Sequence, residues 1–183
     1  MSKPIKIYVA GKMSKHSHFK THYWRDEFLG EINSLTGLSF ISFDPIRTTK
    51  NYTDPEIVFG SDVHMISQVD VLVAYLSEDF SVGGSQEILI AKYFNKPVIA
   101  LAPRGSSYNR KSKEVSGQII QNFRHPFVYS TCDVVCEDVK GVAEALKDLK
   151  NLKPKNIKLI DKAQLKFEKA HSNKPLYELH TIG

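Results

Sequence analysis

This chain contains few cysteines and lacks any long apolar run. Its two cysteines, Cys132 and Cys136, have three residues between them, and no pair of histidines lies nearby in the sequence. That spacing differs from the CxxC pairs of zinc sites, so we expect two buried thiols, no metal and an intracellular, cytoplasmic protein. The N-terminal apolar run leads into a glycine loop and not into a small-residue cleavage site, so we expect a strand and not a signal peptide. No apolar run approaches the length needed to cross a bilayer, and we expect no membrane partner.

Two common phosphate-binding loops are also missing. Without a GxxxxGK[ST] motif, the sequence argues against a nucleoside-triphosphate hydrolase, and no GxGxxG follows the first predicted strand, which argues against a dinucleotide-binding fold. The formal net charge of +5 in 183 residues suits an anionic small ligand as well as nucleic acid. Because the lysines are dispersed and no pattern of stacking aromatic residues is present, we expect no nucleic-acid partner.

A strand–helix–strand pattern occupies the centre of the chain, over residues 69–101. Residues 71–76 form an apolar run that is typical of a strand buried on both faces. A polar loop and the pair Gly83-Gly84 precede a helical run over residues 85–94, and residues 98–101 form a second buried strand. This order predicts a right-handed βαβ unit of a parallel sheet.

The remaining elements complete a flavodoxin-like (Rossmann-like) α/β domain over residues 1–150, with three layers and a five-stranded parallel sheet. We expect residues 102–113 to form a long basic loop. The extension over residues 151–183 is rich in lysine, and the sequence assigns it no role. The other predicted strands cover residues 5–10, 38–43 and 127–131, the last with a continuation to residue 135 as the alternative. The other predicted helices cover residues 19–35, 54–68, 114–122 and 138–149.

The first two helices contain residues whose placement the sequence predicts. Trp24 belongs to an apolar stripe of helix 19–35, and we expect the adjacent Arg25 to be a surface charge, with an anion ligand as the alternative. Asp54 and Pro55 predict a capped start for the next helix. The apolar residues expected to face inward from that helix are Ile57, Val58, Val63 and Ile66.

Polar residues follow several predicted strands and meet at one edge of the predicted sheet. The loops at this edge cover residues 11–14, 44–47, 77–84 and 104–107, and Asp62 and Glu87 lie on the adjoining helices. Ligands of open α/β sheets bind at this edge. The sequence therefore predicts a site with two carboxylates and a glycine-rich loop that contains serine.

Two carboxylates suit chemistry at an acetal-like carbon, where one attacks and the other assists the leaving group. We expect Glu87 in the first turn of its helix to be kept ionised by the backbone dipoles, each interaction contributing about 0.3–1 kcal/mol. Burial and a like charge would raise the pKa of Asp62, which suits an acid. Ser81 and the N–H groups of the Gly83-Gly84 loop are candidates for phosphate binding. The alternative is a favourable first-turn Glu87 and a solvated Asp62, but the nearly all-apolar helix predicts that Glu87 is buried.

Four segments resemble the nucleoside 2-deoxyribosyltransferase family: KIYVAGKMS, FDP, SDVHMISQVDVLVAYL and SVGGSQEILIAKYFNKPVIAL. The resemblance covers residues 5–101 and implies that Glu87 is the nucleophile and that Asp62 protonates or orients the base. Asp70, which opens a strand, matches a structural aspartate. The matching segments also place Tyr8, Gly11 and Asp44 in the substrate pocket.

One departure points to the nucleotide N-hydrolase branch of that family. Transferases that act on free nucleosides often carry an aspartate six residues before the nucleophile, where this chain has Ser81. The branch that hydrolyses 2′-deoxynucleoside 5′-monophosphates implies phosphate contacts from Ser81, Gly83 and Gly84. It also implies a contact from a serine on the helix after the fourth strand, across a dimer interface, and Ser116 is the nearest match.

The resemblance therefore implies a homodimer, without a cofactor, that cleaves the N-glycosidic bond of a (deoxy)nucleoside 5′-monophosphate through a covalent glycosyl–Glu87 intermediate. One alternative is a transferase that exchanges bases between deoxynucleosides. Another is a nucleotide-binding sensor without catalysis, which the presence of Glu87 disfavours. The base, the sugar and the acceptor stay open at the level of the sequence.

Overall fold

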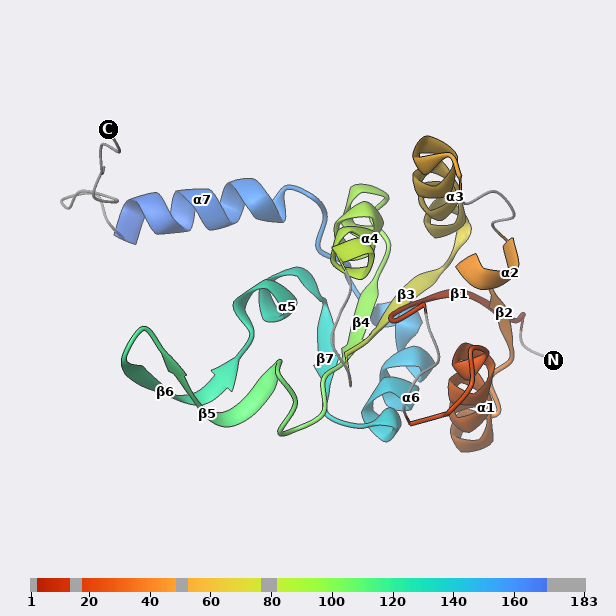
Figure 1. Ribbon diagram of the computed structural model, residues 1–183, viewed down its shortest axis with the longest axis horizontal. Helices are drawn as coiled ribbons and strands as arrows, with labels where there is room; N and C mark the ends of the chain where they lie inside the picture. The colour runs from red at the N-terminus through yellow and green to blue at the C-terminus, as the bar shows by residue number, and fades with distance from the viewer. Residues whose placement is uncertain (1–2, 14–17, 49–52, 77–81, 171–183) are drawn as a thin grey trace.

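The computed structural model describes residues 3–13, 18–48, 53–76 and 82–170. Its centre is a parallel sheet of five strands in the order β2-β1-β3-β4-β7 (Figure 1). In chain order the five strands lie 2-1-3-4-5, which is the flavodoxin-like arrangement. The predicted fold is confirmed. The strands are β1 (Ile5–Ala10), β2 (Phe40–Ser42), β3 (Val71–Tyr75), β4 (Val98–Leu101) and β7 (Val134–Cys136).

Helices cover both faces of the sheet, which explains why its central strands are apolar throughout. The two faces hold separate cores: Ile7 and Val9 of β1 point into one, and Tyr8 points into the other. Helices α1 (Trp24–Thr36) and α6 (Val139–Lys147) pack on the first face. Helices α3 (Pro55–Gln68), α4 (Val82–Tyr93) and α5 (Pro126–Thr131) pack on the second.

Helix α3 begins as the sequence predicts but faces the core differently. The Asp54 side chain accepts hydrogen bonds from the backbone N–H groups of Glu56 and Ile57, at 3.0 and 3.2 Å. The Ile57 side chain is exposed, so the prediction that it faces inward was wrong. Only Met65 and Ile66 of this helix are buried, because only its second half packs on the sheet.

A β-hairpin stands where the sequence predicted a loop and a helix over residues 114–122. Its strands β5 (Asn109–Val115) and β6 (Gln118–Arg124) pair antiparallel. Ser116 and Gly117 connect them with positive φ angles of 51° and 78°. Two such residues form the tight turn whose twist suits a hairpin. The missed signal was Ser-Gly as a two-residue spacer between strand-forming runs.

The predicted strand over residues 127–131 is helix α5, and the fifth sheet strand is β7, which lies further along the chain. A short apolar run does not by itself distinguish a strand from a buried helix. Pro126 favours a helix over a strand here. It occupies the first helical position, where its fixed φ suits a helix and no N–H is needed.

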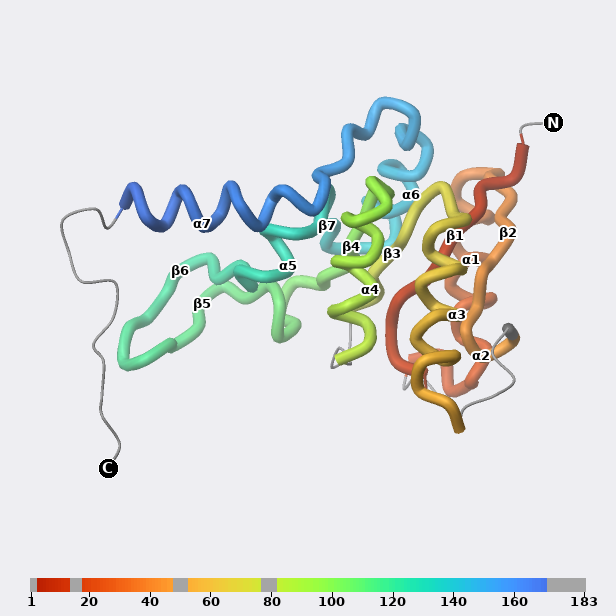
Figure 2. The backbone as a smooth tube through the Cα atoms, turned by 90° about the horizontal axis from the view of Figure 1, so that it is seen from above, coloured from red at the N-terminus to blue at the C-terminus, as the bar shows by residue number. Residues whose placement is uncertain are grey.

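The C-terminal extension is anchored to the domain before it forms an exposed helix. The Lys155 ammonium donates hydrogen bonds to the carbonyls of Ser130 and Cys132, at 3.1 and 2.6 Å, at the end of α5. Helix α7 (Leu159–Ala170) follows and projects away from the sheet (Figure 2). Short helices α2 (Pro45–Thr48) and η1 (Leu149–Asn151) complete the described elements. Within these ranges, no helix is long and apolar enough to cross a membrane.

Candidate functional site

Glu87 and Tyr8 form the centre of a buried polar cluster between α4 and the sheet. The hydroxyl of Tyr8, which is fully buried in β1, donates a hydrogen bond to Oε1 of Glu87 at 3.0 Å. The other carboxylate oxygen of Glu87, Oε2, is also buried and has no hydrogen-bond partner among the described residues. A buried carboxylate oxygen without a partner costs free energy, so this position calls for a functional explanation.

The electrostatic setting of Glu87 differs from the prediction. Helix α4 begins at Val82, so Gly83 and Gly84 lie inside its first turn and Glu87 lies in its second. The helix dipole acts mainly within the first turn, and the expected stabilisation of an ionised Glu87 was therefore wrong. Burial instead raises the pKa of Glu87 to about 7, against an opposing effect of the Tyr8 hydrogen bond.

The nearly all-apolar composition of helix α4 predicted that the helix is buried, but the structure buries only one side of it. Val82, Leu89 and Tyr93 are exposed, while Gly84, Ile88 and Ala91 face the core. Glu87 as a residue is half-buried, and its Oε2 atom is buried on the side of the helix toward Tyr8. The expected burial thus applies to the carboxylate and not to the whole side chain.

Asp62 of α3 is the second carboxylate of the cluster. Its Oδ1 is buried and has no hydrogen-bond partner in the described part of the chain. Burial raises the pKa of Asp62, while Arg25 and the Tyr8 hydroxyl act in the opposite direction. The negative charge of Asp62 also contributes to the raised pKa of Glu87. Two carboxyl groups with raised pKa values thus share one buried environment.

Tyr8 serves as a permanent hydrogen-bond donor in this environment. Burial, followed by the charges of Glu87 and Asp62, raises the pKa of its hydroxyl far above the usual range. The phenol therefore stays protonated at any physiological pH. Its proton holds Glu87 through Oε1 and leaves Oε2 as the atom available for another interaction.

Arg25 is the cation of the cluster, and the expectation that it is a surface charge was wrong. Its side chain is 1% exposed, donates to the Val9 carbonyl at 2.8 Å and to the Gly11 carbonyl at 3.2 Å, and lies 3.8 Å from Asp44. Its guanidinium also stacks over Trp24. A buried charge next to a core tryptophan could not be deduced from the helical pattern, because the fold alone brings the ends of β1 and β2 to it.

Gly11 and Asp44 hold the arginine side of the cluster together. A Cβ atom on Gly11 would lie 2.9 Å from the Trp24 ring, so only glycine permits this close approach. Asp44 is buried, accepts a hydrogen bond from the Ile46 N–H at 3.0 Å and so opens α2. Both residues contact Arg25 or Trp24, and their predicted role in substrate binding stays a prediction.

The other predicted site residues differ in their exposure and in the elements on which they lie. Gly83 is exposed and Gly84 is buried, both in the first turn of α4. Ser81 lies outside the described residues. Ser116 is exposed in the turn of the hairpin and not on a helix, and the hairpin projects away from α4 (Figure 1). Asp70, predicted to be structural, accepts the Lys6 N–H at 2.9 Å and thereby links β1 to the start of β3.

The shared burial of the carboxyls predicts an unusual dependence of stability on pH. Between pH 4.5 and about 7 the folded chain keeps Glu87 protonated, while the unfolded chain releases that proton. Stability attributable to Glu87 therefore falls as the pH rises through this window. We expect Glu87→Gln to be more stable than wild type by about 2–3 kcal/mol at pH 8, and equally stable below pH 4.5. Urea denaturation at both pH values measures this difference, and a constant difference would contradict the assignment.

Comparisons with known proteins identify the fold and no family. No family model matches the chain, and no curated protein sequence matches it. Several solved structures do match. A conserved protein from Enterococcus faecalis V583 aligns with a TM-score of 0.59 and 17% identity, covering 80% of this chain and 99% of that one.

Two other matches are enzymes with a stated activity. A 2-deoxyribosyltransferase from the psychrotolerant bacterium Bacillus psychrosaccharolyticus aligns with a TM-score of 0.52 and 18% identity, over 82% of this chain and 98% of that one. A 2-desoxiribosyltransferase from Leishmania mexicana aligns with a TM-score of 0.50 and 19% identity, over 80% and 98%. The chain thus has the three-layer α/β fold that these 2-deoxyribosyltransferases share, and at these identities the likeness is one of fold.

Proposed function

We propose that this protein is an N-glycosidase that cleaves the N-glycosidic bond of a (deoxy)nucleoside 5′-monophosphate through a covalent glycosyl–Glu87 intermediate. The observation that carries the proposal is the buried Oε2 of Glu87, which has no described partner while Tyr8 holds the other oxygen. A second carboxyl group, that of Asp62, lies in the same cluster. The fold shared with two 2-deoxyribosyltransferases supports chemistry at the anomeric carbon of a nucleoside.

In the proposed first step, ionised Glu87 attacks C1′ of the sugar through Oε2. The C1′–N bond breaks, its electron pair leaves with the base, and protonated Asp62 gives its proton to the departing nitrogen. Burial raises the pKa of Asp62, which is the direction that this step needs. The product of the step is a glycosyl ester of Glu87 and a free base.

In the second step, ionised Asp62 accepts a proton from a water molecule as the water attacks C1′ of the ester. The bond between C1′ and Glu87 breaks, and the sugar phosphate leaves with a new C1′ hydroxyl. Tyr8 assists the release because its hydroxyl donates to the carboxylate as the negative charge returns. The preference for a 5′-monophosphate rests on Ser81 and the Gly83-Gly84 segment and stays a prediction from the sequence.

Chromatography of reaction mixtures tests the proposal. The purified protein is incubated with each common nucleoside and each 5′-monophosphate, with and without a second free base. We expect a free base and a sugar phosphate from a monophosphate without any acceptor base. A protein that binds nucleotides but releases no base under any of these conditions would instead be a sensor.

The fold also favours one other reaction, the exchange of bases between deoxynucleosides. The two enzymes described above are both 2-deoxyribosyltransferases. In that reaction a second base replaces water in attacking the ester of Glu87. The same assay distinguishes the two, because a transferase forms a new nucleoside only when the acceptor base is present.

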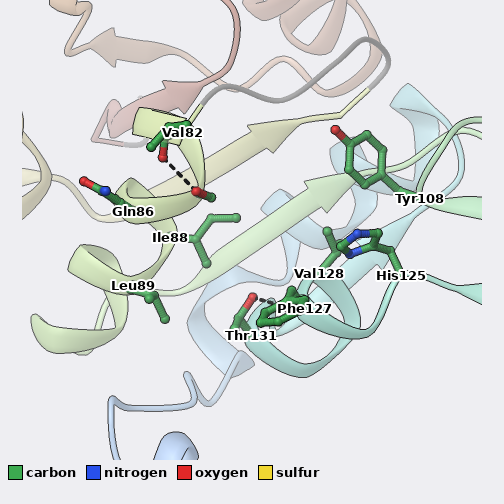
Figure 3. A pocket seen from close by; sticks show the side chains of 10 residues that line it. Val82, Gln86, Ile88, Leu89, Tyr108, His125, Phe127, Val128 and Thr131 are labelled. Atoms are coloured by element: carbon green, nitrogen blue, oxygen red, sulfur yellow. Dashed lines mark hydrogen bonds between the residues drawn. The ribbon is translucent and has the colours of Figure 1, made fainter. Parts of the chain in front are cut away.

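We further propose that the protein is a homodimer joined through a groove between α4 and α5. The groove encloses about 490 Å³, and Figure 3 shows Ile88 and Leu89 on one wall and His125 and Phe127 on the other. Among the residues that the structure describes, its lining contains no acidic residue, lysine or arginine, and burial lowers the pKa of His125, which disfavours the charged form of its imidazole. An uncharged apolar surface suits a symmetric contact, in which each residue meets its own copy or that of a neighbour.

Phe127→Asp tests this interface. Phe127 is 76% exposed at the rim of the groove, so the change leaves the core of the single chain intact. We expect the variant to elute as a monomer in size-exclusion chromatography with light scattering, because a buried unpaired carboxylate would oppose the contact. Leu35→Asp, on an exposed position of α1 on the opposite face, serves as the matched control and should stay dimeric. A monomeric wild type at high protein concentration would contradict the proposal.

A further inference from the structure

Two elements project from the β7 end of the molecule, and both views show them extending in the same direction (Figure 1, Figure 2). One is helix α7, none of whose residues is buried. The other is the β5–β6 hairpin, which buries only Asn109 and Phe123 near its base. We call these two elements the arms. A two-stranded hairpin and a single short helix gain little stability by themselves, so the surfaces that residues up to 170 leave uncovered call for an explanation.

The arms carry most of the net positive charge of the protein. Residues 109–124 contain four lysines and arginines and one glutamate, and residues 159–170 contain three lysines and two acidic residues. The arms together therefore carry a net charge of +4. The rest of the chain has 18 basic and 17 acidic side chains, a net charge of +1. Most of the net positive charge thus lies on the arms, which favours an anionic partner at this end of the molecule.

Uncovered apolar side chains lie among these charges. On α7, Ile160 and Phe167 are 49% and 48% exposed, and with Ala163 they follow spacings of three and four that place them on one side of the helix. On the hairpin, Ile119 is 69% exposed and Ile120 is 41% exposed, next to the turn. Lysines 162 and 169 and Leu165 occupy the opposite side of α7.

We propose that the arms bind the surface of an anionic lipid bilayer. The lysines and arginines would contact acidic headgroups while the isoleucines and Phe167 enter the boundary of the acyl chains. An anionic bilayer surface thus pairs with the basic side chains of the arms and also removes their apolar side chains from water. The prediction of no membrane partner depends on the lack of a segment long enough to span a bilayer, and a helix that lies in the surface needs no such length.

Two other partners fit the arms less well. A nucleic acid would pair with the lysines and arginines but would leave the aliphatic side chains of the hairpin tip and of α7 uncovered. A second copy of the chain, joined symmetrically through the arms, would bring two surfaces of charge +4 together. Like charges at a contact oppose association.

Co-sedimentation with vesicles tests the proposal on the full-length protein. The vesicles contain either phosphatidylcholine alone or equal parts of phosphatidylcholine and phosphatidylserine. We expect the protein to sediment with the anionic vesicles, and the bound fraction to fall as salt rises, because the attraction between exposed charges is screened. We expect the double change Ile160→Asp and Phe167→Asp to weaken the apparent affinity by at least about tenfold, since it places two carboxylates in the apolar contact.

Leu165→Asp supplies the matched control, because it makes the same chemical change on the opposite side of the same helix. It should retain most of the binding. Turnover of all variants should equal that of wild type, which shows that the domain is folded. Equal binding to neutral vesicles, equal loss in the Leu165 control, or no binding to either vesicle would overturn the proposal. Tighter binding to a mixed-sequence DNA or RNA, with displacement from vesicles, would overturn it in favour of a nucleic-acid partner.

Discussion

Glu87→Gln is expected to lower turnover by at least about a thousandfold, because the amide cannot form the glycosyl ester that the proposed mechanism requires. The substitution keeps the size of the side chain and the oxygen that accepts the Tyr8 hydrogen bond at 3.0 Å. Binding of the nucleotide should therefore change much less than turnover. Single-turnover release of the base and equilibrium binding of the same nucleotide measure the two effects separately.

The stability of this variant serves as its own folding control. Because wild-type Glu87 has a pKa of about 7 and must ionise in a buried position, the amide should stabilise the folded chain at pH 8. An inactive but more stable variant cannot be explained by unfolding. Tyr8→Phe removes the hydrogen bond to Oε1 of the Glu87 carboxylate. It should lower turnover less than Glu87→Gln, by about ten- to a hundredfold. Unchanged turnover in Glu87→Gln would exclude Glu87 as the nucleophile.

Asp133→Ala is expected to lower the free energy of unfolding by about 3–5 kcal/mol, because it leaves a buried ammonium without its counterion. Asp133 lies between α5 and β7, where one oxygen accepts hydrogen bonds from the buried Lys92 ammonium and from the Val98 N–H. Its other oxygen accepts the Lys155 N–H at 2.7 Å. A single carboxylate thus joins α4, β4 and the beginning of the C-terminal extension. Urea denaturation gives the loss directly.

Two variants distinguish the destabilisation caused by an unpaired buried ammonium from that caused by the loss of any carboxylate. Asp138→Ala removes an exposed cap of α6, which accepts the Gly141 N–H at 2.8 Å, and should cost only about 1 kcal/mol. Adding Lys92→Met to Asp133→Ala should restore part of the lost stability, since it removes the unpaired ammonium. Burial already lowers the pKa of Lys92, so the ammonium depends on its partner. Equal losses for Asp133→Ala and Asp138→Ala would contradict this account.

The local sequence determined the elements whose signals do not depend on distant residues. The apolar run of β3 has the composition of a doubly covered strand, and the alternation of strands with helices implies a parallel sheet. The start of α3 followed from Asp54 and Pro55, whose effects are confined to one turn. The same local rules failed for residues 114–131, where a hairpin and a short helix compete with other elements of similar propensity.

Glu87 and Asp62 were predicted to lie near each other because helices that follow parallel strands begin at the same edge of the sheet. Their electrostatics were not predictable, since the pKa of a carboxyl group depends on burial and on charges far away in the sequence. Arg25 shows this most clearly. On its helix it looks like a surface charge, yet in the folded chain it lies 1% exposed against the carbonyls of Val9 and Gly11.

The sequence by itself thus determined the alternation of strands and helices over residues 5–101 and predicted Glu87 and Asp62 as candidate catalytic residues, because hydrophobic periodicity and helix caps act over a few residues. Only the tertiary structure decided that Tyr8 holds one oxygen of Glu87, that Arg25 is the buried cation and that the arms are left uncovered. The physical reason is that desolvation and charge pairing arise only when segments distant in the chain pack together and exclude water.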